Sequence, residues 1–150
     1  MSNWTESTTA ERFDGIKVLV LTIAHGPKNR ARVIRRSYEA HVFTPGTATP
    51  VVLESERPFY DPGYLRDAAA FHAEAAAPHA ASACSADDLA ILSFYARPGF
   101  SERPAPWSEA ACKSLVARGL LVYSGADFDL TTTGRWIGQK VITGSPLCAA

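Results

Sequence analysis

The chain has 150 residues, of which 47% are hydrophobic and 20% charged, so it can bury the core of one ordinary domain or of two very small ones. Its 15 basic and 15 acidic residues give a formal net charge of zero, which argues against non-specific coating of nucleic acid but not against a local basic patch. Three cysteines without a CxxC spacing fit a reduced protein better than a disulfide framework.

The N-terminal residues 1–12 are polar and include Glu6 and Glu11, so we predict a flexible lead-in. The segment lacks the basic and apolar regions of a secretory signal. The longest apolar run, around residues 18–24, is far too short to cross a bilayer. We therefore expect a cytoplasmic protein with no membrane partner.

A strand is predicted at residues 15–24, where GIKVLVLTIA is rich in valine, isoleucine and leucine. Its apolar residues continue without alternation, which indicates burial on both faces or pairing inside a sheet that another element covers. Further strands are expected at residues 30–38, 40–44 and 50–54. Together these segments predict a small, mostly antiparallel sheet.

The alanine-rich segment 62–77, PGYLRDAAAFHAEAAA, predicts a helix because alanine is the best helix former and its apolar residues recur at helical spacing. Its natural partner is the preceding sheet, so residues 13–78 make up the first predicted domain. The small residues 79–84, which follow Pro78, are predicted to be a linker.

Residues 85–143 are predicted to form a second domain of helices and a short hairpin. Ser85 is a good N-cap, and Asp87 and Asp88 lie in the first turn, where the helix dipole favours them. Pro98 ends this helix. The elements expected next are a helix at 107–118, strands at 120–123 and 128–131, a last helix capped by Thr132 or Thr133, and a flexible tail at 144–150.

This order of elements, with SLVARGLLVY at 114–123 and DFDLTTTGRWIG at 127–138, resembles the winged-helix family. The resemblance covers under half of the chain. It implies an α+β protein in which a small antiparallel sheet with a covering helix is followed by a winged-helix domain. Family members often bind DNA through the second helix, and many instead serve as protein-interaction or dimerisation modules.

The charges of this second domain leave both roles open. Its expected DNA-contacting helix is nearly neutral, with Lys113 and Arg118 as its candidate binding residues. The predicted wing turn has no lysine or arginine and carries Asp127 and Asp129. Phosphate contacts normally come from basic or amide-bearing side chains on these elements.

A basic cluster lies in the first domain, with five basic residues among nine. It is a candidate surface for phosphate, nucleic acid or an acidic partner. Alternatively, the charges keep a solvated strand from pairing edge to edge with another chain. The cluster consists of Lys28, Arg30, Arg32, Arg35 and Arg36.

The same region, GPKNRARVI at 26–34, resembles a motif of small uncharacterised phage and bacterial proteins. That motif has Gly-Pro-Thr-Asn, a short gap, and then Ala-Arg-Ile. Here Lys28 replaces the threonine and the gap is shorter. The resemblance implies a phage or mobile-element origin.

No motif predicts catalysis, a metal or a cofactor. The histidines at 25, 41, 72 and 79 lack the spacing of metal ligands. The sequence has no GxSxG elbow, no phosphate-binding GxxxxGK loop and no GxGxxG fingerprint. We therefore expect a non-enzymatic binding protein without a cofactor.

Three functions remain open from the sequence. The first is a nucleic-acid-associated regulator of phage or mobile-element type, which could act as a homodimer through the basic cluster. The second is a protein-binding inhibitor or adaptor, such as an anti-CRISPR-like antagonist of a host defence complex. The third, which has the least support, is a small hydrolase or metal enzyme.

Overall fold

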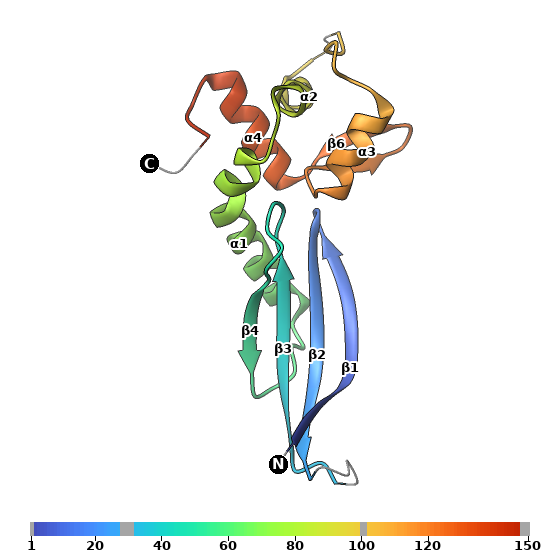
Figure 1. Ribbon diagram of the computed structural model, residues 1–150, viewed down its shortest axis with the longest axis vertical. Coiled ribbons are helices and arrows are strands. Elements are labelled where there is room, and N and C mark those ends of the chain that lie inside the picture. Colours follow the sequence, from blue (N-terminus) through green and yellow to red (C-terminus); the bar gives the residue numbers. More distant parts are fainter. Residues whose placement is uncertain (1, 28–31, 100–101, 148–150) are drawn as a thin grey trace.

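The computed structural model describes residues 2–27, 32–99 and 102–147. It has an α+β fold, as predicted, with a four-stranded antiparallel sheet of order β1-β2-β3-β4 and a helical part at one end of it (Figure 1). The sheet strands are β1 (Ser2–Phe13), β2 (Ile16–Gly26), β3 (Arg35–Phe43) and β4 (Val51–Ser55). The other elements are α1 (Pro62–Ser82), α2 (Ala86–Ala96), α3 (Glu109–Ala117), β5 (Leu121–Ser124), β6 (Asp127–Leu130) and α4 (Thr132–Thr143).

The expected flexible lead-in is instead strand β1, which pairs with β2 from Ser2↔Gly26 to Phe13↔Ile16. Its β-branched threonines suit a strand, and its polar side chains suit an edge position that is exposed on both faces. Asp14 and Gly15 form the turn, both with positive φ angles. An Asp-Gly pair with this geometry is a strong hairpin signal, and it extends the sheet to the start of the chain.

The strands predicted at 30–38 and 40–44 are one continuous strand, β3, which begins only at Arg35. Pairing with β2 from Lys17↔Phe43 to His25↔Arg35 sets its length. The break expected near residue 39 is therefore wrong, because the neighbouring strand satisfies the backbone of Glu39 and keeps it extended.

Helix α1 continues through the segment that was predicted to be a linker. Pro78 lies inside the helix, which ends only at Ser82. The expected boundary at 79–84 is wrong because the last turn of α1 packs into the second core through Ala80 and Ala81. Tertiary burial thus outweighs the local signal of Pro78.

Two cores lie along α1. Its first half packs against the sheet through Leu65, Ala69 and Ala73. The second core lies among the C-terminal helices and the β5–β6 hairpin. Its largest side chains are almost fully buried: Ile91, Leu92, Leu115, Leu120, Leu121 and Ile137.

The turn at the end of β1 joins the sheet to this second core. The Thr132 backbone N–H donates to Asp14 Oδ2 at 2.9 Å, which caps α4 from the other half of the chain. A Cβ atom added to Gly15 would lie 2.6 Å from the carbonyl oxygen of Gly119. The two halves therefore touch backbone to backbone. Among the described residues, no helix is long and apolar enough to cross a membrane.

Candidate functional site

The predicted basic residues do not form one surface. Lys28 and Arg30 lie outside the described residues. The backbone of Arg32 lies beside Gly26, the last residue of β2. The end of β2 and the start of β3 are distant from the C-terminal helices, whereas α3 lies at the opposite end of the molecule (Figure 1). The two groups of predicted binding residues are therefore not contiguous on the surface.

The two arginines of the basic cluster that lie on β3 are paired with carboxylates. Arg36 donates to both carboxylate oxygens of Glu6, from Nε at 2.7 Å and from Nη2 at 3.1 Å. These bonds hold the pKa of Glu6 below its usual value and raise that of Arg36. Arg35 lies 3.9 Å from Glu56. Both arginine side chains nevertheless stay about half exposed, at 53% and 49%.

Arg118 has an internal structural role. Its guanidinium donates to Asp88 at 2.8 Å and to the Ala83 carbonyl at 3.2 Å, so it ties the end of α3 to the α1–α2 junction. Burial raises the pKa of Asp88, but the bonds from Arg118 and Ser85 outweigh it and hold the pKa below its usual value. Lys113 pairs with Glu109 on the same helix at 3.2 Å.

The β5–β6 hairpin is fastened to the helices by a polar network. Trp107 Nε1 donates to the Tyr95 hydroxyl at 3.0 Å, and that hydroxyl donates to Asp127 at 2.8 Å. Burial and the Asp127 bond raise the pKa of Tyr95. Arg103 stacks 3.7 Å from the centre of the Trp107 ring and lies 3.8 Å from Asp127. The one arginine in this network, Arg103, is therefore opposed by Asp127.

The two faces of the sheet differ in how they are covered. Ile16, Val18 and Val20 of β2 point toward α1 and belong to the first core. The intervening residues of β2, which include Leu19, Leu21 and Ile23, point the other way and are only half-buried. Within the described ranges, α1 is the one helix packed on the sheet, so this second face, here called the open face, is uncovered.

The register shows which side chains surround these aliphatic residues on the open face. On the β1 side, Thr8 and Ala10 are opposite Leu21 and Leu19. On the β3 side, Glu39 and His41 occupy the same two rows. The β4 residues that complete the rows are Glu54 and Val52, and Val52 is 43% exposed.

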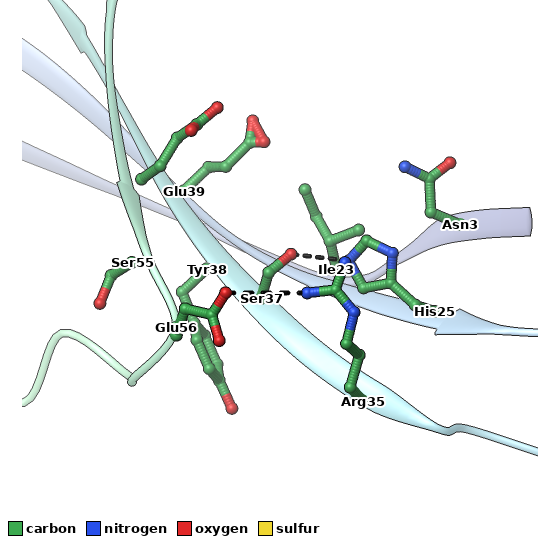
Figure 2. A pocket seen from close by; sticks show the side chains of 10 residues that line it. Asn3, Ile23, His25, Arg35, Ser37, Tyr38, Glu39, Ser55 and Glu56 are labelled. Carbon is green, nitrogen blue, oxygen red and sulfur yellow. Dashed lines mark hydrogen bonds and ion pairs between the residues drawn. The ribbon is translucent and has the colours of Figure 1, made fainter.

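A hollow of about 450 Å³ lies at the distal end of the open face (Figure 2). His25 Nε2 and Ser37 Oγ are 2.8 Å apart in its floor, and Figure 2 shows Arg35 reaching toward Glu56 across it. The residues that line it are Asn3, Ile23, His25, Arg35, Ser37, Tyr38, Glu39, Glu54, Ser55 and Glu56.

The His25–Ser37 contact is the closest the described chain comes to a catalytic pair. Acyl transfer also needs donors for the developing oxyanion, usually N–H groups at a sharp turn or a helix N-terminus. The residues that line this hollow come from the four strands and from Glu56 directly after β4, so no helix start faces Ser37. We interpret the contact as one that positions the two side chains. In the described part of the chain, no group of three or more potential ligands could hold a metal ion.

Sequence reasoning did not identify the open face as a site. The unbroken apolar run of β2 was its signal, because such a strand is expected to be covered on both faces. The pairing of Glu39 with Glu54 left no signal, since it depends on the register of two strands. Comparison with known protein families, curated proteins and solved structures gave no match.

Proposed function

We propose that this chain is a non-enzymatic binding protein whose partner is another protein, and that the open face of the sheet is the binding surface. The observation that carries the proposal is the half-buried row of Leu19, Leu21 and Ile23 on a central strand whose opposite row packs against α1 through Ile16, Val18 and Val20. Neighbouring apolar side chains that stay partly accessible and have no covering element are typical of interaction sites.

The size of the open face is sufficient for this role. It is four strands wide, and β3 is nine residues long. Ordinary strand spacing and rise give it dimensions of roughly 15 by 30 Å. Each partner in a standard interface contributes about 800 Å² of surface, so the open face could supply much of that area.

We also propose that residues 85–143 form a winged-helix domain that serves as a scaffold. The order α2, α3, β5–β6 hairpin and α4 supports this assignment. Its six basic and six acidic residues leave it formally neutral, which suits a scaffold better than a DNA-contacting domain. This reading favours the inhibitor or adaptor hypothesis over the nucleic-acid-associated regulator.

Nucleic acid remains the second candidate partner, because Arg32, Arg35 and Arg36 are exposed together at the distal end of the sheet. A phosphate group could compete with Glu6 or Glu56 for the two arginines of β3. Binding of this kind would weaken steeply with salt, since it releases counterions from the nucleic acid.

The test compares capture of proteins from a native lysate by three forms of the full chain. These are the wild type, the double variant Leu21→Thr/Ile23→Thr on the open face, and Ile142→Thr as a matched control. Ile142 is 41% exposed on α4, away from the sheet. We expect the wild type and the control to capture the same protein and the double variant to lose it.

Nuclease treatment of the lysate and an Arg35→Gln/Arg36→Gln variant separate the two candidates. Capture that survives nuclease and the arginine substitutions supports a protein partner. Capture that both treatments abolish, while Leu21→Thr/Ile23→Thr leaves it intact, would contradict the proposal in favour of nucleic acid.

A further inference from the structure

The open face carries a chemical pattern that identifies its partner more closely. We infer that it binds an amphipathic helix of the partner protein, with aliphatic residues along one side and arginine or lysine beside them. This inference rests on the proposed function, because it names the occupant of the same surface.

The covered face of the sheet shows that a helix fits such a surface. There α1 packs Leu65, Ala69 and Ala73, at four-residue spacing, on the apolar residues of β2 and β3. On the open face, Leu19 and Ile23 are four residues apart on one strand, a span of roughly 13 Å. Residues i, i+4 and i+7 of a helix span about 10 Å. A second helix would complete a three-layer arrangement.

The charge of the partner follows from Glu39 and Glu54. They are directly opposite each other in the β3–β4 register, and like charges in that position destabilise a sheet. Glu39 contacts His41 at 3.1 Å, but a neutral imidazole offers only a hydrogen bond. A guanidinium or ammonium group placed between the two carboxylates would relieve their repulsion.

The hollow beside the aliphatic row carries the same sign of charge. It is lined by three glutamates and one arginine, which is a net formal charge of −2 when His25 is neutral. Arg35 is already directed toward Glu56, at 3.9 Å. The partner must therefore supply the remaining positive charge, next to the residues that cover Leu21 and Ile23. Phosphate groups of a nucleic acid would meet these carboxylates unfavourably.

A second copy of this chain is a poorer occupant of the open face. Pairing of the two distal halves would bring together the same three carboxylates from each copy. It would add to the repulsion that a basic helix removes. Arg12 and Lys17, two further cations that the register places on this face, lie at its other end, beside the Asp14–Gly15 turn.

The experiment selects a displayed, charge-balanced library of random 18-residue peptides on the intact wild-type chain. We expect the enriched peptides to carry leucine or isoleucine at helical spacing together with arginine or lysine. The best peptide is then titrated by fluorescence anisotropy against variants. Glu39→Gln/Glu54→Gln should weaken its Kd at least about tenfold, the value of one charge-assisted hydrogen bond.

The control variant is Glu11→Gln/Glu74→Gln, which changes the net charge equally at two exposed positions outside the open face. It should leave the Kd unchanged apart from a small long-range effect that salt removes. Circular dichroism verifies that all variants are folded, and removing two like charges from the sheet should not destabilise it.

The remaining outcomes separate the inference from the proposed function. Peptides that lose binding with Leu21→Thr but not with Glu39→Gln/Glu54→Gln would overturn the cationic partner and keep the open face as a binding site. Peptides that are insensitive to Leu21→Thr would overturn both. Sedimentation that shows a wild-type dimer, lost in Leu21→Thr, would assign the face to a second copy.

Discussion

The two halves of the molecule contain similar apolar side chains but bury them to different extents. In the C-terminal half, Leu92 and Leu115 are fully buried between helices and a hairpin. In the N-terminal half, the sheet buries one row of β2 under α1 and leaves Leu19 and Leu21 half-exposed. Helix α1 belongs to both halves, since its first turns pack on the sheet and its last turns join the second core.

This difference separates stability from binding. Burial in the C-terminal half stabilises the fold, because the apolar side chains there are already removed from water. The aliphatic residues of the open face contribute less to folding, and the rest of their burial becomes available when a partner covers them. The comparison can be tested by substitutions that distinguish the two halves.

The largest loss of stability is expected from a substitution in the core of the C-terminal half. Leu92→Ala should lower the free energy of unfolding by about 3 kcal/mol, because Leu92 is 0% exposed and its removal leaves a cavity beside α4. Equilibrium urea denaturation measures the change. A loss below about 1 kcal/mol would show that this half is more loosely packed than we describe.

The ion pair of Asp88 with Arg118 should contribute a smaller, pH-dependent amount. Asp88→Asn should cost about 1–2 kcal/mol at pH 7, because the 2.8 Å charge-assisted bond is lost. The folded pKa of Asp88 lies below its usual value, so its stabilising effect is present above the unfolded pKa and disappears as the pH falls through the folded value.

Urea denaturation at pH 7 and at successive values below pH 4 checks this sign. The wild type and the variant should converge in stability as the wild-type carboxyl becomes protonated. A stability difference between the two proteins that stays constant over that range would mean that the charge of Asp88 does not contribute to stability.

The junction between the halves depends on the cap that Asp14 gives to α4. Asp14→Gly keeps the positive φ angle without strain and removes the acceptor for Thr132 N–H, so we expect a loss of about 1 kcal/mol. Amide hydrogen exchange at Thr132 should also become faster. Asp14→Asn, which retains an acceptor oxygen and tolerates this backbone conformation, serves as the control. Equal exchange rates in all three proteins would rule out the cap.

The smallest effect on folding is expected on the open face. Leu21→Ala should cost less than about 1 kcal/mol, because a half-exposed side chain loses little burial and can relax without a cavity. The same denaturation experiment measures it beside Leu92→Ala. A cost equal to that of the buried leucine would show that Leu21 completes the core and is not reserved for a partner.

The sequence predicted best the elements that have local signals. Ser85 caps α2 in a reciprocal capping box with Asp88, and Thr131 caps α4 one or two residues before the expected positions, Thr132 and Thr133. Caps, turn residues and helical spacing act within a few residues, so they can be read along the chain. The helix, helix, hairpin and helix order of the C-terminal half was predicted on these grounds.

Elements that depend on distant partners were predicted poorly. Strand β1 is polar and looked flexible, yet β2 supplies its backbone partners along its whole length. Pro78 indicated a linker, but packing of Ala80 and Ala81 in the second core keeps α1 continuous. The partners of the candidate binding residues could not be predicted for the same reason, because the ion pairs of Arg36 and Arg118 join residues about thirty positions apart.

By itself, the sequence determined the fold class, the alanine-rich helix, the capped C-terminal helices, and the position of β2 inside a sheet that another element covers. These features follow from side-chain chemistry over short stretches of chain. Only the tertiary structure decided that α1 covers one face and leaves the other open, and that Glu39 is opposite Glu54 beside the half-buried leucines. Strand register and layer packing decide such neighbours, and they exist only once segments far apart in the chain have come together.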